Sequence, residues 1–199
     1  MRSMLRAPWQ WPSAAHRRLL NVFRSTCIIL LTLSMGACSL FSKPEPSGVA
    51  LPDRRVAWRL HASPSLNTLE DGRSLALLVR IYRLHSPDKF LQAPADTFGD
   101  AKREKDALGD DLVSVREVQL LPGQRHNAIE TMPRDIAHVG IVALFHRPAA
   151  GRWRQAFAST PSELTGIDIG LHACAMTVHR GLPLGASAER MRSAPISCD

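Results

Sequence analysis

The sequence lacks an apolar run long enough to cross a membrane. Its most apolar stretch, residues 27–33 with the small residues that follow, reaches only about a dozen residues, whereas a membrane-spanning helix needs roughly 20. Five arginines and no acidic residue lie in residues 1–37. A short apolar core between basic and small residues is typical of a signal peptide, so the chain is predicted to leave the cytoplasm.

The apolar stretch ends in Met35-Gly36-Ala37-Cys38, which resembles a bacterial lipobox. We therefore expect residues 1–37 to be a lipoprotein signal peptide that is removed, and acyl lipid to be attached to the thiol of Cys38. Ser39, rather than Asp, follows the cysteine, and by resemblance to enteric lipoprotein sorting this favours the outer membrane. The alternative is an ordinary signal peptide in which Cys38 is incidental.

Little net charge remains once the leader is removed. The whole chain has 25 Lys and Arg against 18 Asp and Glu, a net charge of +7. Without the five leader arginines the balance is 20 to 18. A basic surface of the kind that binds nucleic acid is therefore not expected.

Cysteine is also scarce. After cleavage and lipidation only Cys174 and Cys198 remain, and two such residues in an oxidising compartment often pair. A bridge would close a loop of 25 residues and stabilise the fold by roughly 3–4 kcal/mol in the chain-entropy model. The alternative is two free thiols.

Motifs that carry chemistry are missing. The sequence has no G-x-S-x-G elbow, no P-loop and no dinucleotide glycine fingerprint. His172 and Cys174 are two residues apart, with His146 and His179 nearby, but a zinc site needs three or four converging ligands. The pair Asp110-Asp111 is expected to be solvated. We therefore predict no enzyme activity, no catalytic residues, no metal, no cofactor beyond the acyl lipid, and no small-molecule substrate.

Turn residues and apolar alternation divide the mature chain. Residues 38–52 are rich in Pro, Ser and Gly and are predicted to be a flexible tether. Residues 53–180 are predicted to form the folded domain and residues 181–199 a C-terminal tail. Within the domain, residues 63–74 contain Pro64, Asn67 and Asp71-Gly72 and indicate a loop.

Short strands dominate the folded part. Residues 56–61, 75–84, 113–120, 126–132, 137–146, 152–158 and 167–175 show strand patterns, and the fifth is apolar on both faces, which indicates a central position. The last would place Cys174 on the outward face. Arg80 and Arg83 are expected to be charges at the rim of their strand.

Residues 87–110 lack the strand pattern. They are predicted to be a short helical insertion on the surface, with Asp100 as the N-terminal cap of a helix and Gly109 as its C-terminal stop. The pattern as a whole predicts an all-β fold, an antiparallel β-sandwich with this helical insertion.

A set of short motifs then occurs in a specific order. They are the lipobox, Leu66-Asn67, Asp71-Gly72-Arg73, Val79-Arg80-Ile81-Tyr82-Arg83-Leu84, Phe90, Leu108-Gly109-Asp110-Asp111-Leu112, Leu121-Pro122-Gly123, the strand from His138 to Phe145, and Trp153-Arg154. In this order the motifs resemble the TssJ (SciN-like) family, the outer-membrane lipoproteins of the type VI secretion system. The similarity covers residues 56–178. The pair of Cys174 and Cys198 is not part of the shared pattern.

The resemblance implies a transthyretin-like sandwich with a structural role. The protein would be anchored in the outer membrane by the acyl lipid, face the periplasm, and bind the periplasmic C-terminal domain of the inner-membrane protein TssM within the TssL/TssM membrane complex. In the family the loop between the first two strands is important for this contact. Here it comprises Ser65, Leu66, Asn67, Thr68, Leu69, Glu70, Asp71, Gly72 and Arg73.

Two other interpretations of the loop and the domain remain open. In the first, the loop is only a connector; in the second, the domain is a periplasmic lipoprotein module that binds carbohydrate or peptidoglycan. The second interpretation predicts exposed aromatic platforms, for which Trp58, Tyr82 and Trp153 are the candidates. An envelope hydrolase is disfavoured because no nucleophile motif is present.

Replacement of Cys38 tests the anchor. Cys38→Ser is expected to leave a folded domain and to abolish type VI secretion, because the acyl chains supply membrane affinity of about 0.8 kcal/mol per buried methylene. The measurement is effector release by cells that carry the variant, with domain folding followed in parallel. Normal secretion by Cys38→Ser would refute the anchoring role.

Overall fold

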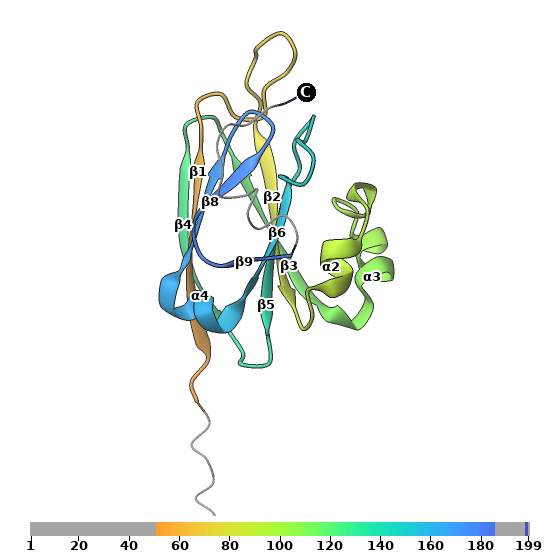
Figure 1. The fold of residues 1–199 in the computed structure, drawn as a ribbon, viewed down its shortest axis with the longest axis vertical. Helices are drawn as coiled ribbons and strands as arrows, with labels where there is room; N and C mark the ends of the chain where they lie inside the picture. Colours follow the sequence, from red (N-terminus) through yellow and green to blue (C-terminus); the bar gives the residue numbers. More distant parts are fainter. Residues whose placement is uncertain (1–50, 186–197, 199) are drawn as a thin grey trace, which may run out of the picture. The chain divides into compact units, whose positions relative to one another are not determined.

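The computed structural model describes residues 51–185 and residue 198, which form two packed β-sheets and a helical insertion (Figure 1). The first sheet has the strand order β4-β1-β7-β8 and the second β3-β2-β5-β6-β9. The predicted all-β sandwich is confirmed. The signal peptide, Cys38 and most of the tether lie outside the described residues.

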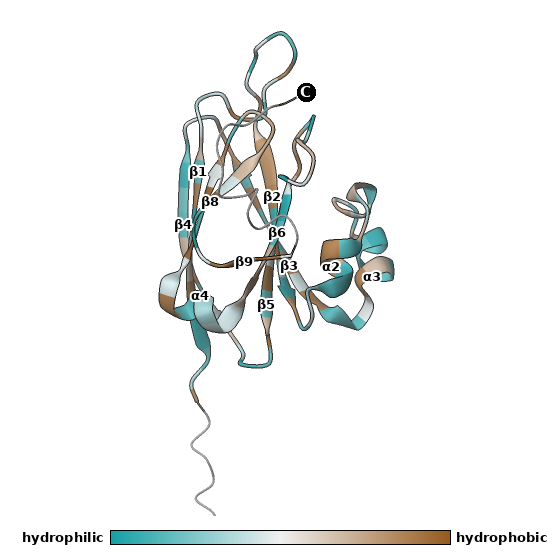
Figure 2. Cartoon of the chain, viewed as in Figure 1, coloured by the Kyte–Doolittle hydropathy of each residue, from teal (hydrophilic) through white to brown (hydrophobic). Residues whose placement is uncertain are grey.

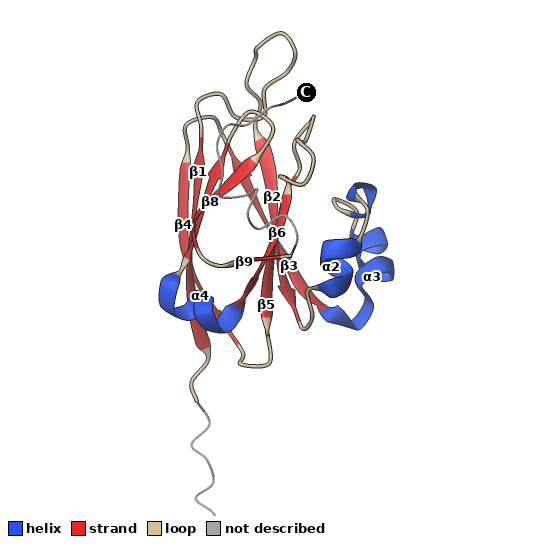
Figure 3. Ribbon diagram, in the orientation of Figure 1, coloured by secondary structure: helices blue, strands red, loops and turns tan. Residues whose placement is uncertain are grey.

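The elements follow one another along the chain with short connections. The strands are β1 (Arg54–Ala62), β2 (Leu77–Leu84), β3 (Leu112–Leu120), β4 (Arg125–Met132), β5 (His138–Ala143), β6 (Arg154–Ala158), β7 (Ile167–Leu171), β8 (Met176–Arg180) and β9 (Pro183–Leu184). The helices are α2 (Asp88–Gln92), α3 (Ala101–Leu108) and α4 (Ser159–Thr165), with short 3-10 turns at Ala95–Thr97 and Gly109–Asp111. Figure 3 shows that the helices gather in two places, α4 at one sheet and α2 with α3 at the other.

Most strand pairs are antiparallel. The exception is β1 with β7, which run parallel with Trp58 opposite Ile167. Strand β5 is central in its sheet and pairs with β2 and β6. The second sheet extends beyond residue 180, because β9 pairs with β6 and the Gln155 side chain donates to the Leu184 carbonyl.

The main core lies between the sheets and follows from strand alternation. In β1 every second side chain is buried, including Val56, Trp58 and Leu60. Strand β5 contributes Val139 and Ile141 to the same core. In the hydropathy colouring β2 and β5 are brown and the edge strand β4 is largely teal (Figure 2).

A second core lies on the opposite face of β5 and holds the insertion. Phe90 and Phe98 of the insertion pack on Tyr82, with ring centroids 5.2 and 5.7 Å from the Tyr82 ring. Gly140 makes this possible, since a Cβ there would lie 2.6 Å from Phe90 Cζ. The two-faced apolar pattern of β5 thus reflects one core on each side.

Buried charges fasten α3 to the second sheet. Glu104 is fully buried and accepts hydrogen bonds from Arg80 Nη2 at 2.6 Å, Tyr82 Oη at 2.6 Å and the Gly99 amide at 2.8 Å. Arg80 also pairs with Glu117 on β3. Burial, reinforced by the Glu104 carboxylate, raises the pKa of Tyr82, so its hydroxyl keeps the proton that it donates.

Two expectations are corrected here, and one helix was missed. Arg80 is not a rim charge, since it is 6% exposed and bound to Glu104. Residues 167–175 are not one strand: β7 ends at Leu171, a turn follows, and Cys174 is buried in that turn. Helix α4 was not predicted, because its sequence STPSELT has no apolar periodicity.

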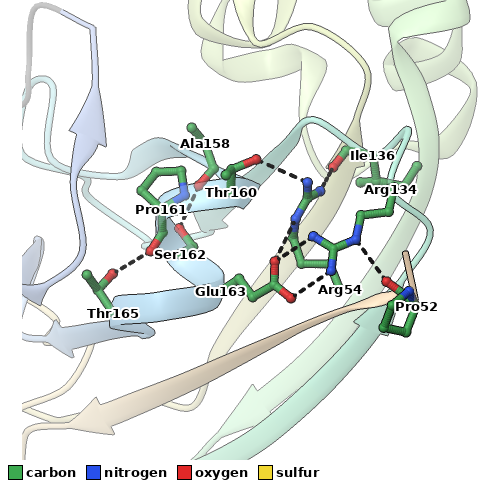
Figure 4. A network of polar contacts seen from close by, with 10 residues as sticks. All are labelled: Pro52, Arg54, Arg134, Ile136, Ala158, Thr160, Pro161, Ser162, Glu163 and Thr165. Carbon is green, nitrogen blue, oxygen red and sulfur yellow. Dashed lines mark hydrogen bonds and ion pairs between the residues drawn. The ribbon is translucent and has the colours of Figure 1, made fainter. Parts of the chain in front are cut away.

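Polar contacts compensate for the missing apolar face of α4. Arg54 is buried at the start of β1, donates to Thr160 Oγ1 and to the Ile136 carbonyl, and pairs with Glu163 (Figure 4). Arg134 also binds Glu163, at 2.8 and 3.2 Å. The helix is therefore held against β1 by two guanidinium groups.

Removal of the buried carboxylate tests the attachment of the insertion. Glu104→Leu is expected to lower the free energy of unfolding by about 3–5 kcal/mol, because it leaves Arg80 buried with one ion partner fewer. The matched control is Glu117→Leu, which removes the half-exposed partner of the same arginine and should cost about 1 kcal/mol or less. Equal losses for the two variants in urea unfolding would contradict this role for Glu104.

Candidate functional site

Loops from three parts of the chain meet at one end of the sandwich, which we call the loop end. They are residues 63–76 between β1 and β2, residues 144–153 between β5 and β6, and residues 172–175 between β7 and β8. In Figure 1 the first of these projects at the top, while the described chain begins at the bottom, below α4. The predicted partner loop therefore lies at the end of the sandwich away from residue 51.

Asn67 joins the three loops. Its amide N–H donates to the His172 carbonyl at 3.0 Å, its Nδ2 donates to the Ala76 carbonyl at 2.9 Å, and its Oδ1 accepts from the His146 amide at 2.8 Å. Its φ of +47° is left-handed, a conformation that asparagine tolerates better than most residues. The neighbouring Leu66 is fully buried in the main core.

The tip of the loop is a tight turn closed by local bonds. The Gly72 amide donates to the Leu69 carbonyl, the Leu69 amide donates to the Arg73 carbonyl, and Thr68 forms an isolated bridge with Ser74. Asp71 accepts from the Arg73 amide at 3.0 Å and from Arg73 Nε at 2.6 Å. The Arg73 amide, followed by the Arg73 side chain, lowers the pKa of Asp71, so the tip presents one carboxylate and one guanidinium.

The nine predicted partner-binding residues divide by exposure. Ser65, Glu70, Asp71, Gly72 and Arg73 are exposed, Thr68 and Leu69 are half-buried, and Leu66 and Asn67 are buried. The buried pair can act on a partner only through the conformation of the loop. Leu69 is half-buried, and its side chain lines a hollow beside the loop.

The hollow has a volume of about 220 Å³ and brings together residues that lie far apart in the sequence. Its lining is Thr68, Leu69, Glu70, Arg147, Ala173, Cys174 and Cys198. Arg147 Nη1 pairs with Glu70 Oε1 at 2.5 Å. Sequence reasoning missed Arg147 and Ala173.

Cys174 and Cys198 form a disulfide in the structure, with Cα atoms 5.7 Å apart. The bond joins the C-terminal end of the chain to the turn between β7 and β8. That turn also supplies the carbonyls of His172 and Ala173, which accept from the amides of Asn67 and Thr68. The disulfide thus lies next to the contacts that hold the partner loop.

Histidines gather on the outer face of the first sheet, but do not form a metal centre of the usual kind. Nε2 atoms of His172 and His179 lie 2.9 and 3.0 Å from Thr177 Oγ1. Burial, then the charges of His179 and Arg152, lowers the pKa of His172. Across residues 51–185, no group of three or more His, Cys, Asp or Glu side chains is arranged to hold a metal ion.

The aromatic candidates for a carbohydrate platform are covered. Trp58 is 2% exposed and stacks on His126, and Tyr82 is fully buried. Trp153 is half-buried and packs on Phe98 at 5.6 Å. In the described part of the chain, none of the three presents an open ring face of the kind that a sugar-binding surface needs.

Two packed sheets, with loops joined by hydrogen bonds at one end, place the described residues in the β-sandwich class of proteins. A family model described as type VI secretion lipoprotein (VasD, EvfM, TssJ) matches residues 54–174. The chain therefore belongs to the type VI secretion lipoprotein family, whose members are structural components of that system and not enzymes. No helix in residues 51–185 has the length and apolar character needed to cross a membrane.

Solved structures with the same fold agree with this assignment. The type VI lipoprotein TssJ1 from Pseudomonas aeruginosa is 29% identical over 68% of this chain and 99% of its own, with a TM-score of 0.59. Serratia marcescens Lip, a membrane-bound component of the type VI system, is 16% identical over 66% of this chain and 98% of its own, with a TM-score of 0.56. A chain from a structure described as the TssM C-terminal domain from EAEC is 21% identical over 63% of this chain and 97% of its own, with a TM-score of 0.52. No curated protein matches the chain.

Replacement of Asn67 tests how the loop end is held. Asn67→Ala is expected to lower the free energy of unfolding by about 2–4 kcal/mol, because the His146 amide loses its acceptor and alanine is disfavoured at positive φ. Asn67→Gly should recover only the conformational part of this loss. The control is Asn127→Ala on the exposed face of β4. Wild-type urea midpoints for Asn67→Ala would contradict this role.

Proposed function

We propose that this protein is anchored in the outer membrane through lipid on Cys38 and binds the periplasmic C-terminal domain of TssM with residues 65–73. The observation that carries the proposal is the pre-formed, charged tip of that loop at the loop end of the sandwich. A loop that is already ordered costs less conformational entropy on binding than a flexible one. Membership of the type VI lipoprotein family supports the partner class.

Hydrogen bonds at the other end of the sandwich fix the point where the tether joins the domain. Arg134 Nε donates to the Pro52 carbonyl at 2.8 Å while its guanidinium binds Glu163 (Figure 4). The first described residues are thereby fixed beside α4, away from the loop end. The tether therefore joins the domain at the end opposite residues 65–73, which leaves that loop free of the attachment point.

The domain plan follows from the same proposal. Residues 1–37 are the signal peptide that is cleaved, residues 38–52 the flexible tether, residues 53–180 the sandwich domain with its insertion at 87–110, and residues 181–199 the C-terminal tail. The fourteen residues after Cys38, residues 39–52, span at most about 45–50 Å. Within that reach the lipid keeps the domain at a high effective concentration near the membrane complex formed by TssL and TssM.

Binding of the two proteins tests the role. The mature chain with Cys38→Ser is expected to bind the periplasmic C-terminal domain of the cognate TssM, and a variant with residues 65–73 shortened is expected to lose binding. A finer change is the double variant Asp71→Ala, Arg73→Ala, which should weaken binding about thirtyfold, the lower limit for an interfacial hot spot. Affinity is measured by calorimetry at fixed salt.

The helical insertion offers a matched control. Lys102 and Asp106 form an exposed ion pair at 2.6 Å, the same separation as Arg73 and Asp71, and both pairs should contribute little to stability. Lys102→Ala, Asp106→Ala should bind like wild type. Binding by the shortened-loop variant would move the interface elsewhere, and no binding by a folded wild type would reject TssM as the partner.

A further inference from the structure

We propose that the partner-binding surface extends from residues 65–73 across the hollow to Arg147 and the disulfide-bonded C-terminus, and that the hollow receives one aliphatic side chain of the partner protein. This inference rests on the proposed function and deepens it, because it names the chemistry that the partner presents. It also assigns a role to Cys174 and Cys198, which the shared family pattern leaves out.

The size of the hollow selects its occupant. At about 220 Å³ it exceeds the roughly 30 Å³ that one water takes in the liquid. It is smaller than the roughly 300–1,000 Å³ of pockets that enclose small-molecule ligands. A volume between these limits suits a single branched side chain on a protein surface.

The lining of the hollow favours an apolar occupant. Leu69 and Ala173 line it, together with the disulfide-bonded residues Cys174 and Cys198. Its two charged residues, Glu70 and Arg147, are paired with each other at 2.5 Å, so neither presents an uncompensated charge to a guest. An aliphatic side chain would therefore be desolvated there without separating an ion pair, as in the apolar centre of a protein interface.

The walls of the hollow are pre-formed. The Thr68 amide donates to the Ala173 carbonyl at 2.9 Å, and the Ala149 amide donates to the Cys174 carbonyl at 2.9 Å. Behind them Ala149, Cys174 and Ala175 form a small buried cluster. A pocket whose walls are fixed before binding loses little entropy when it is filled, which is the property of an interface hot spot.

The hollow is also continuous with the predicted loop. Thr68, Leu69 and Glu70 belong both to residues 65–73 and to its lining. A partner that contacts the tip at Asp71 and Arg73 therefore contacts residues next in sequence to those that line the hollow. This continuity favours a protein partner with a protruding side chain over an unrelated ligand.

Hydrogen exchange tests the surface without any substitution in the folded domain. The mature chain with Cys38→Ser is mixed with the periplasmic C-terminal domain of TssM, and amide exchange is followed by mass spectrometry. Slowed exchange is expected in residues 65–73, 145–151 and 172–175 together. Protection confined to residues 65–73 would overturn the inference and leave the proposed function intact, whereas absence of binding would overturn both.

Filling the hollow tests its occupant. Ala173→Trp is expected to weaken TssM binding at least tenfold, and the control Ala107→Trp, an exposed position on α3, should bind like wild type. The double variant Cys174→Ser, Cys198→Ser should bind more weakly, by about three- to tenfold, because the C-terminal wall is released. Wild-type affinity for Ala173→Trp would exclude the hollow from the interface, and wild-type affinity for the double serine variant would exclude the C-terminus.

Discussion

The side chain of Asn67 is the constraint on which the loop end depends. The Asn67 side-chain amide donates to the Ala76 carbonyl in its own loop and accepts from the His146 amide in the loop after β5. The Asn67 backbone N–H donates to the His172 carbonyl in the turn after β7. These are donors and acceptors that burial would otherwise leave unpaired. A single residue type with a short amide and tolerance of positive φ meets all three demands, so the conformation of three loops is linked to the identity of one residue.

The contacts that hold the helical insertion are separate from those that hold the loop end. The insertion is held by its own aromatic cluster and by buried Glu104, on the face of β5 opposite the main core. The loop end is held by Asn67, by Leu66 in the main core and by the disulfide. Because the two regions use different contacts on a shared sheet, changes in the insertion should reach the loop end only weakly, which is why α3 supplies suitable controls for binding.

The elements that could be predicted from the sequence are those that depend on residues close together in the chain. Alternation identified the strands and the central β5, and Asp100 and Gly109 marked the start and end of α3, where the Asp100 carboxylate accepts from the Arg103 amide. The misses depend on contacts between distant residues. Arg80 seemed a rim charge because its partner Glu104 lies 24 residues away. Helix α4 is held by Arg54 and Arg134 rather than by an apolar face.

Residues 65–73 were predicted as the partner loop through a family pattern, but the residues beside them were not predicted, for a topological reason. Arg147 and Ala173 follow ordinary strands and carry no motif; they meet Glu70 and Thr68 only because the loops after β1, β5 and β7 reach the same end of the sandwich. The break at residues 172–175 was hidden by an alternation that continued through the turn. Had β7 been ended at Leu171, the strand directions alone would have placed Cys174 at the loop end, and the disulfide would have been expected beside the partner loop.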